Sequence, residues 1–349
     1  RAQFTQLLKD GIPIHADMFG YPEAYYVPPT QVIDHIDFVH GGASLMYGPQ
    51  PGGALNFVTK DPTDSAFRFE AENSGGSHDF FSTYESISGT QGNVGYTGYF
   101  HHRQAQGFRD FNSQVDLEYG GLKLKIEQDP TLHWTLGWDS YHETHGEPGG
   151  LTRAQFDRAP SVSTKRMDRF ELNRHSGSIG FEKEISENTQ LDVKAYGVYY
   201  ERLSWRQRTN GAAFGLTPSG INASTNDIEN QEFYTGGVDA RLAHQYSALG
   251  SEEHVLTGGV LYYHTTSPRL DSRGALGDAD TGVLRKDADR TVDTLSFFAE
   301  NLFKFGKFSI TPGVRLESIW QSIQENLNAD KVTVPLANDE ESEFEVLGG

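Results

Sequence analysis

The chain has 349 residues, a formal net charge of −19 and no cysteine. The lack of thiols excludes a disulfide framework and a thiolate metal site or nucleophile, and the negative charge disfavours a nucleic-acid partner because phosphate contacts need a basic face. Glycine is abundant, with 38 residues, aromatic residues make up 12% and hydrophobic residues only 36%. This composition suits β-strands that face lipid on one side and water on the other better than a soluble protein with a thick core.

The first 62 residues combine short apolar segments with glycine turns. Residues 32–60 read VIDHIDFVHGGASLMYGPQPGGALNFVTK, in which an apolar extended segment precedes two glycine pairs and a strand at 54–60. Glycine at fixed offsets between β-rich segments marks tight turns and close backbone approach. No phosphate loop or dinucleotide fingerprint fits, because no helix pattern follows the glycines.

Two-residue alternation dominates the sequence after Pro62. In residues 307–320, Val314 and Trp320 share one face of the expected strand, while Arg315 and Glu317 share the other. Such long alternation indicates half-exposed strands, longer than the roughly five or six residues usual in a soluble β-sandwich. About eleven strands are predicted, near residues 66–73, 79–88, 94–105, 114–127, 131–142, 170–182, 189–205, 232–245, 254–266, 291–304 and 308–322.

The connections between these strands tend to alternate between short and long. We expect long loops at 143–169, 206–231 and 267–290, with short turns in between. Short turns at one end of the strands and long loops at the other are typical of outer-membrane β-barrels. Aromatic residues near strand ends before long loops suggest an interfacial girdle; they include Tyr199, Tyr200, Trp205, Tyr262, Tyr263 and Trp320.

The glycine-rich segment resembles the second half of the plug domain of TonB-dependent outer-membrane receptors. Residues 7–13 (LLKDGIP) resemble the plug strand that precedes it, and residues 295–317 resemble the recurrent barrel hairpin of the same family, with its Pro-Gly-x-Arg strand. The plug-motif positions are Asp10, Gly11, Gly41, Gly42, Tyr47, Gly48, Gly52, Gly53 and Asn56.

The resemblance implies a mainly β fold, a large antiparallel transmembrane β-barrel with an N-terminal mixed α/β plug domain. These receptors close 22 strands around the plug, so about eleven strands form half a barrel. We therefore expect residues 1–62 to be the C-terminal half of the plug and residues 66–349 the N-terminal half of the barrel. The alternative is that the chain is complete and the strand count is wrong, since an open sheet would leave unpaired edges in lipid.

The same resemblance implies a bacterial outer-membrane location and import of a ferric siderophore. A TonB-type energy-transducing protein would act through a segment outside this chain, and outer-membrane lipid would surround the barrel. No cofactor, directly bound metal or catalytic residue is expected, and no Gly-x-Ser-x-Gly nucleophile elbow stands at a strand–helix junction.

The three long loops are nearly neutral, with twelve basic and eleven acidic side chains, in a chain of net charge −19. Arginine forms charge-assisted, bidentate bonds to carboxylates, so this end of the strands favours an anionic cargo. Within the family, residues 18–29 (the apex loop), 46–60 and 147–170 resemble ferric citrate receptors. The resemblance implies a ferric citrate complex held between the plug apex and arginines of the barrel wall.

The candidate ligand-binding residues are Tyr21, Gln50, Arg202, Arg206, Arg285 and Lys286. Where ferric citrate receptors carry apex glutamines, this chain has Tyr21 and Glu23, and a carboxylate there would repel an anion. A related iron-carboxylate complex is therefore an alternative cargo. Further alternatives are the same fold importing a catecholate siderophore, cobalamin or a glycan, and a non-transport β-sandwich or adhesin.

Overall fold

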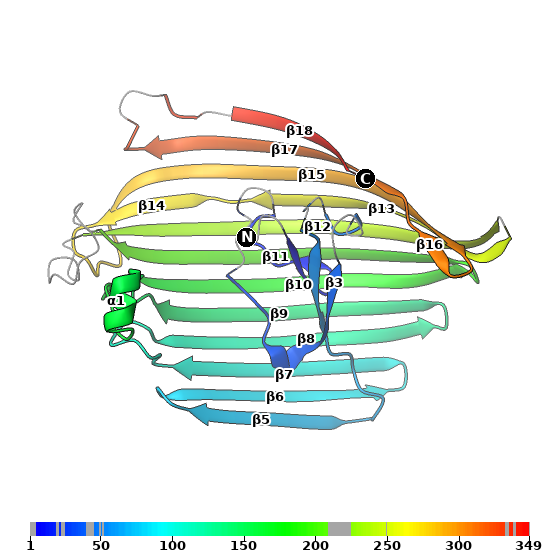
Figure 1. Ribbon diagram of the computed structural model, residues 1–349, viewed down its shortest axis with the longest axis horizontal. Helices are drawn as coiled ribbons and strands as arrows, with labels where there is room; N and C mark the ends of the chain where they lie inside the picture. The colour runs from blue at the N-terminus through cyan, green and yellow to red at the C-terminus, as the bar shows by residue number, and fades with distance from the viewer. Residues whose placement is uncertain are drawn as a thin grey trace.

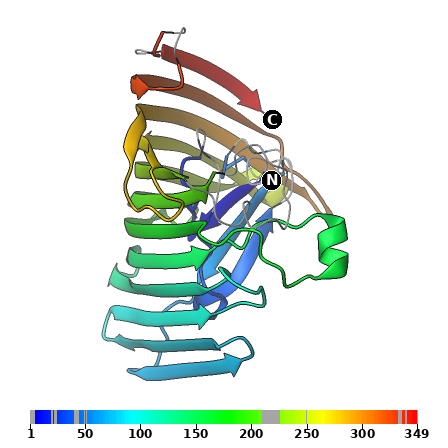
Figure 2. The ribbon, with the colours of Figure 1, turned by 90° about the vertical axis from the view of Figure 1, so that its left-hand side faces the viewer.

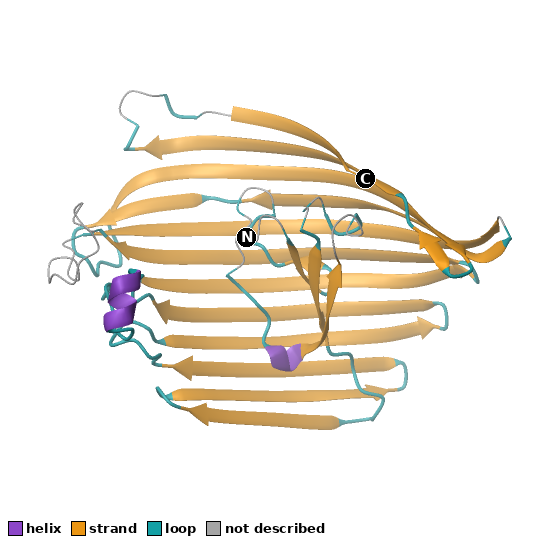
Figure 3. Cartoon of the chain, viewed as in Figure 1, coloured by secondary structure: helices purple, strands orange, loops and turns teal. Residues whose placement is uncertain are grey.

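The computed structural model describes residues 5–18, 21, 25–39, 45–48, 50, 52–208, 225–248, 250–331, 335–337 and 340–348. Two sheets are present, a large curved sheet and a small sheet that lies against one of its faces (Figures 1 and 2). Strands dominate the described residues (Figure 3). No helix in these residues is long and apolar enough to cross a membrane.

The small sheet has the strand order β2-β1-β4-β3. Its strands are β1 (Gln6–Lys9), β2 (Ile12–Pro13), β3 (Ile33–Val39) and β4 (Ala54–Thr59), and the 3-10 helix η2 (Thr30–Val32) precedes β3. β1 and β4 are parallel, whereas the other two pairings are antiparallel. In the described part of residues 1–62, η2 is the only helical element, so the helical component of the expected α/β plug is small there.

The Asp-Gly turn between β1 and β2 forms as predicted. Asp10 and Gly11 both have positive φ, at 49° and 79°, which glycine adopts readily. The carboxylate of Asp10 accepts hydrogen bonds from Thr59 N at 2.9 Å and Thr59 Oγ1 at 2.8 Å. Gly11 N donates to Asn56 Oδ1 at 2.9 Å. The turn is therefore fixed to β4, the strand parallel to β1.

The second glycine pair also lies at a turn. Gly53 has φ of 89°, and its N–H donates to the carbonyl of Gln50 at 3.1 Å. Gly52 is exposed in this turn, and Gly48 is buried before it. Gly41 and Gly42, the first pair, lie outside the described residues.

The large sheet is antiparallel throughout and runs in the order β18-β17-β15-β13-β12-β11-β10-β9-β8-β7-β6-β5. Its strands are β5 (Arg68–Gly76), β6 (Phe80–Gln91), β7 (Val94–Ala105), β8 (Val115–Asp129), β9 (Leu132–Gly146), β10 (Arg169–Ser186), β11 (Thr189–Gln207), β12 (Asn226–Ala248), β13 (Ser251–Thr266), β14 (Arg269–Gly274), β15 (Val283–Phe305), β16 (Phe308–Ile310), β17 (Gly313–Asn328) and β18 (Glu340–Gly348). Helix α1 (Arg153–Arg158) lies between β9 and β10.

Each of the eleven predicted strands has a counterpart, but two expectations were wrong. The loop expected at 267–290 contains β14, which pairs with β12 and β15, and the first part of β15. The strands here continue past the region where apolar residues alternate, so the sequence lacked the signal. Strand β18, which pairs with β17 from Arg315↔Gly348 to Ile323↔Glu340, was missed.

Alternation places apolar side chains on the outer face of the large sheet. On β17, Val314 is 46% exposed, while Arg315 and Glu317 on the inner face are 2% and 1% exposed. On β9, Trp138 is exposed and the next residue, Asp139, is buried. The predicted two-faced pattern is therefore confirmed, with polar residues turned toward the small sheet.

The two ends of the large sheet differ. At one end, the loop end, lie the connections 106–114, 147–168 and 275–282, together with the end of β11 and the start of β12; at the other, the turn end, lie 92–93, 130–131, 187–188 and 306–307. Figure 1 shows α1 at the loop end, on the left.

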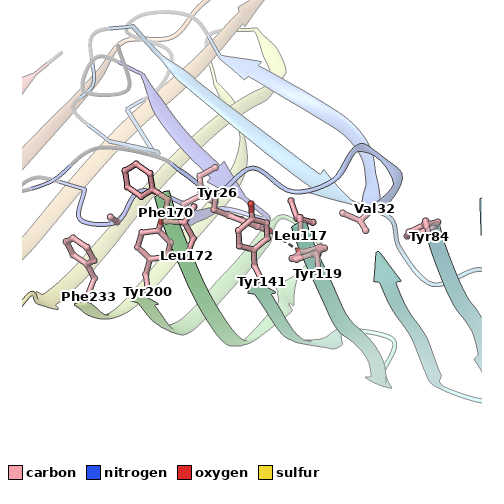
Figure 4. Packing of buried hydrophobic residues seen from close by; sticks show 12 residues of the cluster. Tyr26, Val32, Tyr84, Leu117, Tyr119, Tyr141, Phe170, Leu172, Tyr200 and Phe233 are labelled. Atoms are coloured by element: carbon pink, nitrogen blue, oxygen red, sulfur yellow. Dashed lines mark hydrogen bonds between the residues drawn. The ribbon is translucent and has the colours of Figure 1, made fainter. Parts of the chain in front are cut away.

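The hydrophobic core lies between the two sheets rather than within either one. The segment between β2 and β3 contributes Ile14, Ala16, Tyr26 and Val32, which pack against inner-face residues of the large sheet. Figure 4 shows this cluster, whose large-sheet members are Tyr84, Leu117, Tyr119, Tyr141, Phe170, Leu172, Tyr200 and Phe233.

The aromatic girdle was partly mispredicted. Tyr262 and Trp320 are exposed on the outer face, at 44% and 39%. Tyr200 and Tyr263 are buried on the inner face, at 4% and 1%, because adjacent residues of a strand point to opposite sides. These two tyrosines therefore belong to the core between the sheets.

Candidate ligand-binding site

One row of side chains on β11 builds the wall of the candidate site. Tyr200, Arg202, Ser204 and Arg206 are alternate residues, so they share the inner face at the loop end of the strand. Ser204 is fully buried, and Arg202 is 5% exposed. The predicted strand 189–205 included Arg202 but ended before Arg206; β11 extends to Gln207, which brings both arginines onto the same strand.

Tyr21 and Tyr25, two described residues of the apex loop (residues 18–29), lie opposite this row. Their rings stack with centroids 6.4 Å apart, and their hydroxyls are 2.9 Å apart. Tyr21 also packs on Phe233 of β12 at 5.8 Å, and Tyr25 packs on Phe170 of β10 at 5.9 Å. These four rings form one surface, the aromatic shelf, where the apex loop meets the barrel-like wall.

Arg202 lies on the aromatic shelf and is held on two sides. Its guanidinium carbon is 4.8 Å from the Phe170 ring centroid and 5.3 Å from that of Tyr25, distances at which a cation is attracted to the ring face. Its Nη1 donates to Gln231 Oε1 at 2.8 Å and to Glu229 Oε2 at 3.1 Å. Its buried Nε–H has no acceptor among the described residues, so one donor remains for a further partner.

Arg206 lies four residues after Arg202 on β11, and its side chain is more exposed. Its guanidinium carbon is 4.3 Å from the ring centroid of Phe170. Its Nη1 pairs with the carboxylate of Glu147 and lies 3.9 Å from Asp168 Oδ2. Burial raises the pKa of the Asp168 carboxyl, against the opposing effects of the Gln207 N–H and Lys165.

The basic residues of β14 and β15 continue this charged surface. Arg269 pairs with Asp271 at 2.8 Å and lies 3.6 Å from Glu229, the carboxylate that also contacts Arg202. Lys286 lies 3.9 Å from Asp271. A line of alternating charges thus connects Arg202 to Lys286 through Glu229, Arg269 and Asp271. Arg269 was not among the predicted site residues, although Arg285 and Lys286 of the same expected loop were.

Arg285 lies apart from this line. Its Nη2 donates to Asp330 Oδ1 at 2.6 Å, in the connection between β17 and β18. The guanidinium of Arg285 lowers the pKa of the Asp330 carboxyl. The structure therefore joins Arg285 to an outer connection, and none of its described contacts reaches the aromatic shelf.

Gln50 also lies away from the shelf in its described contacts. Its carbonyl accepts from Gly53, and its side chain lies beside Gly48 near the start of β1. The guanidinium carbon of Arg241, on β12 toward the turn end, lies 5.1 Å from the ring centroid of Tyr47. Glu23, whose carboxylate would repel an anionic ligand, lies outside the described residues.

The site is not a simple basic pocket, because acidic side chains balance its basic ones. Glu147, Asp168, Glu229 and Asp271 stand against Arg202, Arg206, Arg269 and Lys286. These carboxylates were not among the predicted site residues. Glu229 meets Arg202 through strand register, and Glu147 and Asp168 meet Arg206 through the path of the connection 147–168. The wall therefore carries arginines whose charge is largely neutralised by resident acids.

Two outer connections at this end are hydrogen-bonded to each other, and we call them the canopy (residues 106–114 and 147–168). Asn112 Nδ2 donates to the carbonyls of Glu147 at 2.9 Å and Asp168 at 2.7 Å. Arg109 Nε donates to the carbonyl of Val162 at 2.8 Å. Gln207 Oε1 accepts from Arg166 N and Met167 N, which ties the canopy to the end of β11.

Comparison with known proteins supports the same architecture. Residues 118–342, more than half of the chain, match the family model "TonB dependent receptor-like, beta-barrel". The fold is similar to the ferric citrate transporter FecA in its unliganded form, with a TM-score of 0.84 and 21% identity over 99% of this chain. The chain spans 51% of that protein's length.

Other solved structures share the fold at lower identity. The ferric-catecholate import receptor Fiu of E. coli K12 matches 98% of this chain and 59% of its own, with a TM-score of 0.75 and 14% identity. The siderophore receptor PiuA of Acinetobacter baumannii matches 98% of this chain and 53% of its own, with a TM-score of 0.77 and 11% identity. On the strength of the family match, the chain belongs to the TonB-dependent receptor-like β-barrel family.

Proposed function

We propose that the chain is part of an outer-membrane receptor that imports a ferric siderophore. Residues 1–62 would be the C-terminal half of its plug and residues 66–349 the N-terminal half of its barrel. The apolar outer face of the large sheet would contact lipid, and the long connections would face the cell exterior, as in outer-membrane barrels generally. The role is transport rather than catalysis.

The observation that carries the proposal is the position of Arg202 and Arg206 against the apex loop. Both guanidiniums stack on the aromatic shelf, and the Nε–H of Arg202 has no acceptor among the described residues. Arginine presents donors in a planar fork that matches carboxylate oxygens. We propose that the cargo is ferric citrate or a related iron-carboxylate complex, bound between Tyr21, Tyr25 and these two arginines.

Transport would need the plug to rearrange after cargo binds. The proposed partner is a TonB-type protein that acts from the periplasmic side through a segment outside this chain. The plug is held to the wall by a limited set of polar contacts toward the turn end, such as Arg241 Nη2 with the carbonyl of Met46 at 3.2 Å. A pull on the plug would have to break contacts of this kind.

A catecholate siderophore is the second candidate cargo. The aromatic shelf favours it, because four rings within stacking distance of one another suit a planar aromatic ligand.

Binding and uptake assays decide between these cargoes. Full-length receptor in detergent is titrated with ferric citrate and with a ferric catecholate, and iron uptake is measured in cells with and without TonB. Arg202→Gln and Arg206→Gln should each weaken ferric citrate binding about tenfold or more, the loss expected for one charge-assisted contact. Arg153→Gln on α1, which removes an exposed arginine of the canopy, is the matched control. Tighter binding of the catecholate, or uptake that persists without TonB, would contradict the proposal.

A further inference from the structure

The two wall arginines differ in how firmly their resident acids hold them. Arg202 has a side chain only 6% exposed and donates to two acceptors, Glu229 and Gln231. Arg206 has a side chain 34% exposed, and its close ion-pair partner is Glu147, whose side chain is 31% exposed. An ion pair with this exposure is weak and exchangeable, whereas the Arg202 contacts are enclosed.

Glu147 is anchored by its backbone and not by its carboxylate. It is the first residue after β9; its N–H donates to the carbonyl of Asp168 at 2.8 Å, and its own carbonyl accepts from Asn112. The only described partner of its carboxylate is Arg206. The side chain can therefore rotate away from Arg206 while the base of the canopy keeps its backbone hydrogen bonds.

We infer that Glu147 is a resident counter-ion that cargo must displace from Arg206. This rests on the proposed function, since it concerns the same site and the same anionic cargo. When a ligand carboxylate binds the guanidinium of Arg206, the Glu147 carboxylate dissociates from it and rotates into solvent. Asp168 stays behind, because its side chain is 8% exposed and accepts from Gln207 N at 2.7 Å.

Such an exchange makes Glu147 a selectivity element. A weakly binding anion gains little binding free energy when its carboxylate replaces that of Glu147 on Arg206. Only a ligand with several carboxylates or added ring contacts binds with a net gain in free energy. Specificity by an element that disfavours competitors is a general device of binding sites. Glu147 would thus separate a chelated iron complex from free small acids at the same arginine.

The test compares Glu147→Gln with Asp157→Asn in the full-length receptor in detergent. Both changes remove one negative charge from the same connection, but Asp157 pairs with Arg153 on the outside of α1. The probes are ferric citrate and iron-free citrate. We expect Glu147→Gln to tighten binding of both, by about fivefold, with the larger gain for iron-free citrate, and Asp157→Asn to leave both within twofold.

Separate outcomes address the inference and the proposed function. If wild type binds ferric citrate but Glu147→Gln binds it equally or more weakly, the counter-ion role is wrong and the proposed function stands. If both variants tighten binding alike, the effect is one of general charge and the inference is again wrong. If wild type does not bind ferric citrate, the proposed cargo fails and the inference fails with it.

Amide hydrogen exchange without ligand gives an independent check. Residues 159–168 should stay as protected in Glu147→Gln as in wild type, because Asn112 and Arg109 hold this part of the canopy. Loss of protection there would show that Glu147 serves to hold the canopy, and the inference would be wrong.

Discussion

Lys9 of the plug donates to Asp139 of the barrel wall with Nζ and Oδ2 2.7 Å apart. The other oxygen of Asp139 accepts from Arg174 Nη1 at 2.8 Å, so one buried carboxylate faces two buried cations. Burial alone would lower the pKa of Lys9, but the Asp139 carboxylate and nearby tyrosines raise the pKa above its ordinary value. This buried group joins β1 of the small sheet to β9 and β10 of the large sheet.

Replacing Asp139 by Asn should loosen the plug. Lys9 and Arg174 would be left buried without a counter-charge, and removing one partner of a buried ion pair costs roughly 3–5 kcal/mol. We expect a lower melting temperature and faster amide exchange at residues 6–9. The control is Lys125→Gln, in a pair with Asp61 whose two side chains are about half exposed, where less than about 1 kcal/mol is expected. Unchanged exchange at residues 6–9 in Asp139→Asn would count against a central role for this carboxylate.

Tyr25 should contribute to cargo binding through its ring. The ring contacts Phe170 and lies under the guanidinium of Arg202. Tyr25→Phe keeps the ring and should stay within about threefold of wild-type affinity for the cargo, whereas Tyr25→Ala should lose about tenfold, since a desolvated cation–π contact is worth about 1–2 kcal/mol. Titration of full-length variants measures both. Equal losses in the two variants would assign the effect to the hydroxyl instead.

The fold of the canopy should require glycine at position 149 but not at position 150. Gly149 has φ of +80°, and an added Cβ would collide with Thr164 Oγ1 and come within 2.8 Å of Lys165 Cγ. Gly150 has open space at the same position. Gly149→Ala should therefore expose residues 147–168 to limited proteolysis, at a cost of about 1–3 kcal/mol for the strained backbone, while Gly150→Ala stays resistant. Equal cleavage of the two variants would contradict this account.

Asp61 should contribute stability that disappears in acid. Burial raises its pKa, but the hydrogen bond from Lys125 and the charge of Lys123 outweigh this and leave the pKa below its ordinary value. A carboxyl with a lowered folded pKa stabilises the protein above its unfolded pKa of about 3.9, and the effect is lost as pH falls through the folded pKa. Wild type should therefore melt above Asp61→Asn at pH 7 and pH 5, and the difference should close below about pH 4.

The control for this pH series is Asp64→Asn, an exposed carboxyl three residues away. It should melt as wild type does at neutral pH. A difference between wild type and Asp61→Asn that persists unchanged at pH 3 would show that Asp61 acts through something other than its charge.

The strands could be predicted because the barrel wall has two unlike faces. Trp138 beside Asp139, and Val314 beside Arg315, reveal the period of two directly in the sequence. β14 lies beyond the apolar band and gave no such signal, which is why it was assigned to a loop. β18 was missed although Phe344 and Val346 alternate with Glu343 and Glu345. The turn between β1 and β2 could also be predicted from the sequence, since Asp10 and Gly11 adopt the positive φ that an Asp-Gly pair suggests.

The candidate site was harder to predict, because its character depends on long-range pairing. Arg202 and Arg206, predicted from the sequence as ligand-binding candidates, both lie against the Phe170 ring of the aromatic shelf. Nothing local in the sequence joins Arg206 to Glu147 or Arg202 to Glu229. These acids decide whether the arginines are free to bind an anion. Strand register and the path of the canopy set the pairs, and neither can be read from residue types alone.

The canopy is held largely through main-chain carbonyls, which accept from the side chains of Asn112 and Arg109. Main-chain atoms are present whatever the residue type, so the outward side chains of α1 can be replaced without loss of these bonds. Sequence changes on the outer surface of α1 can therefore accumulate while the wall beneath keeps its geometry. The outer surface and the candidate site are in this way free to change separately.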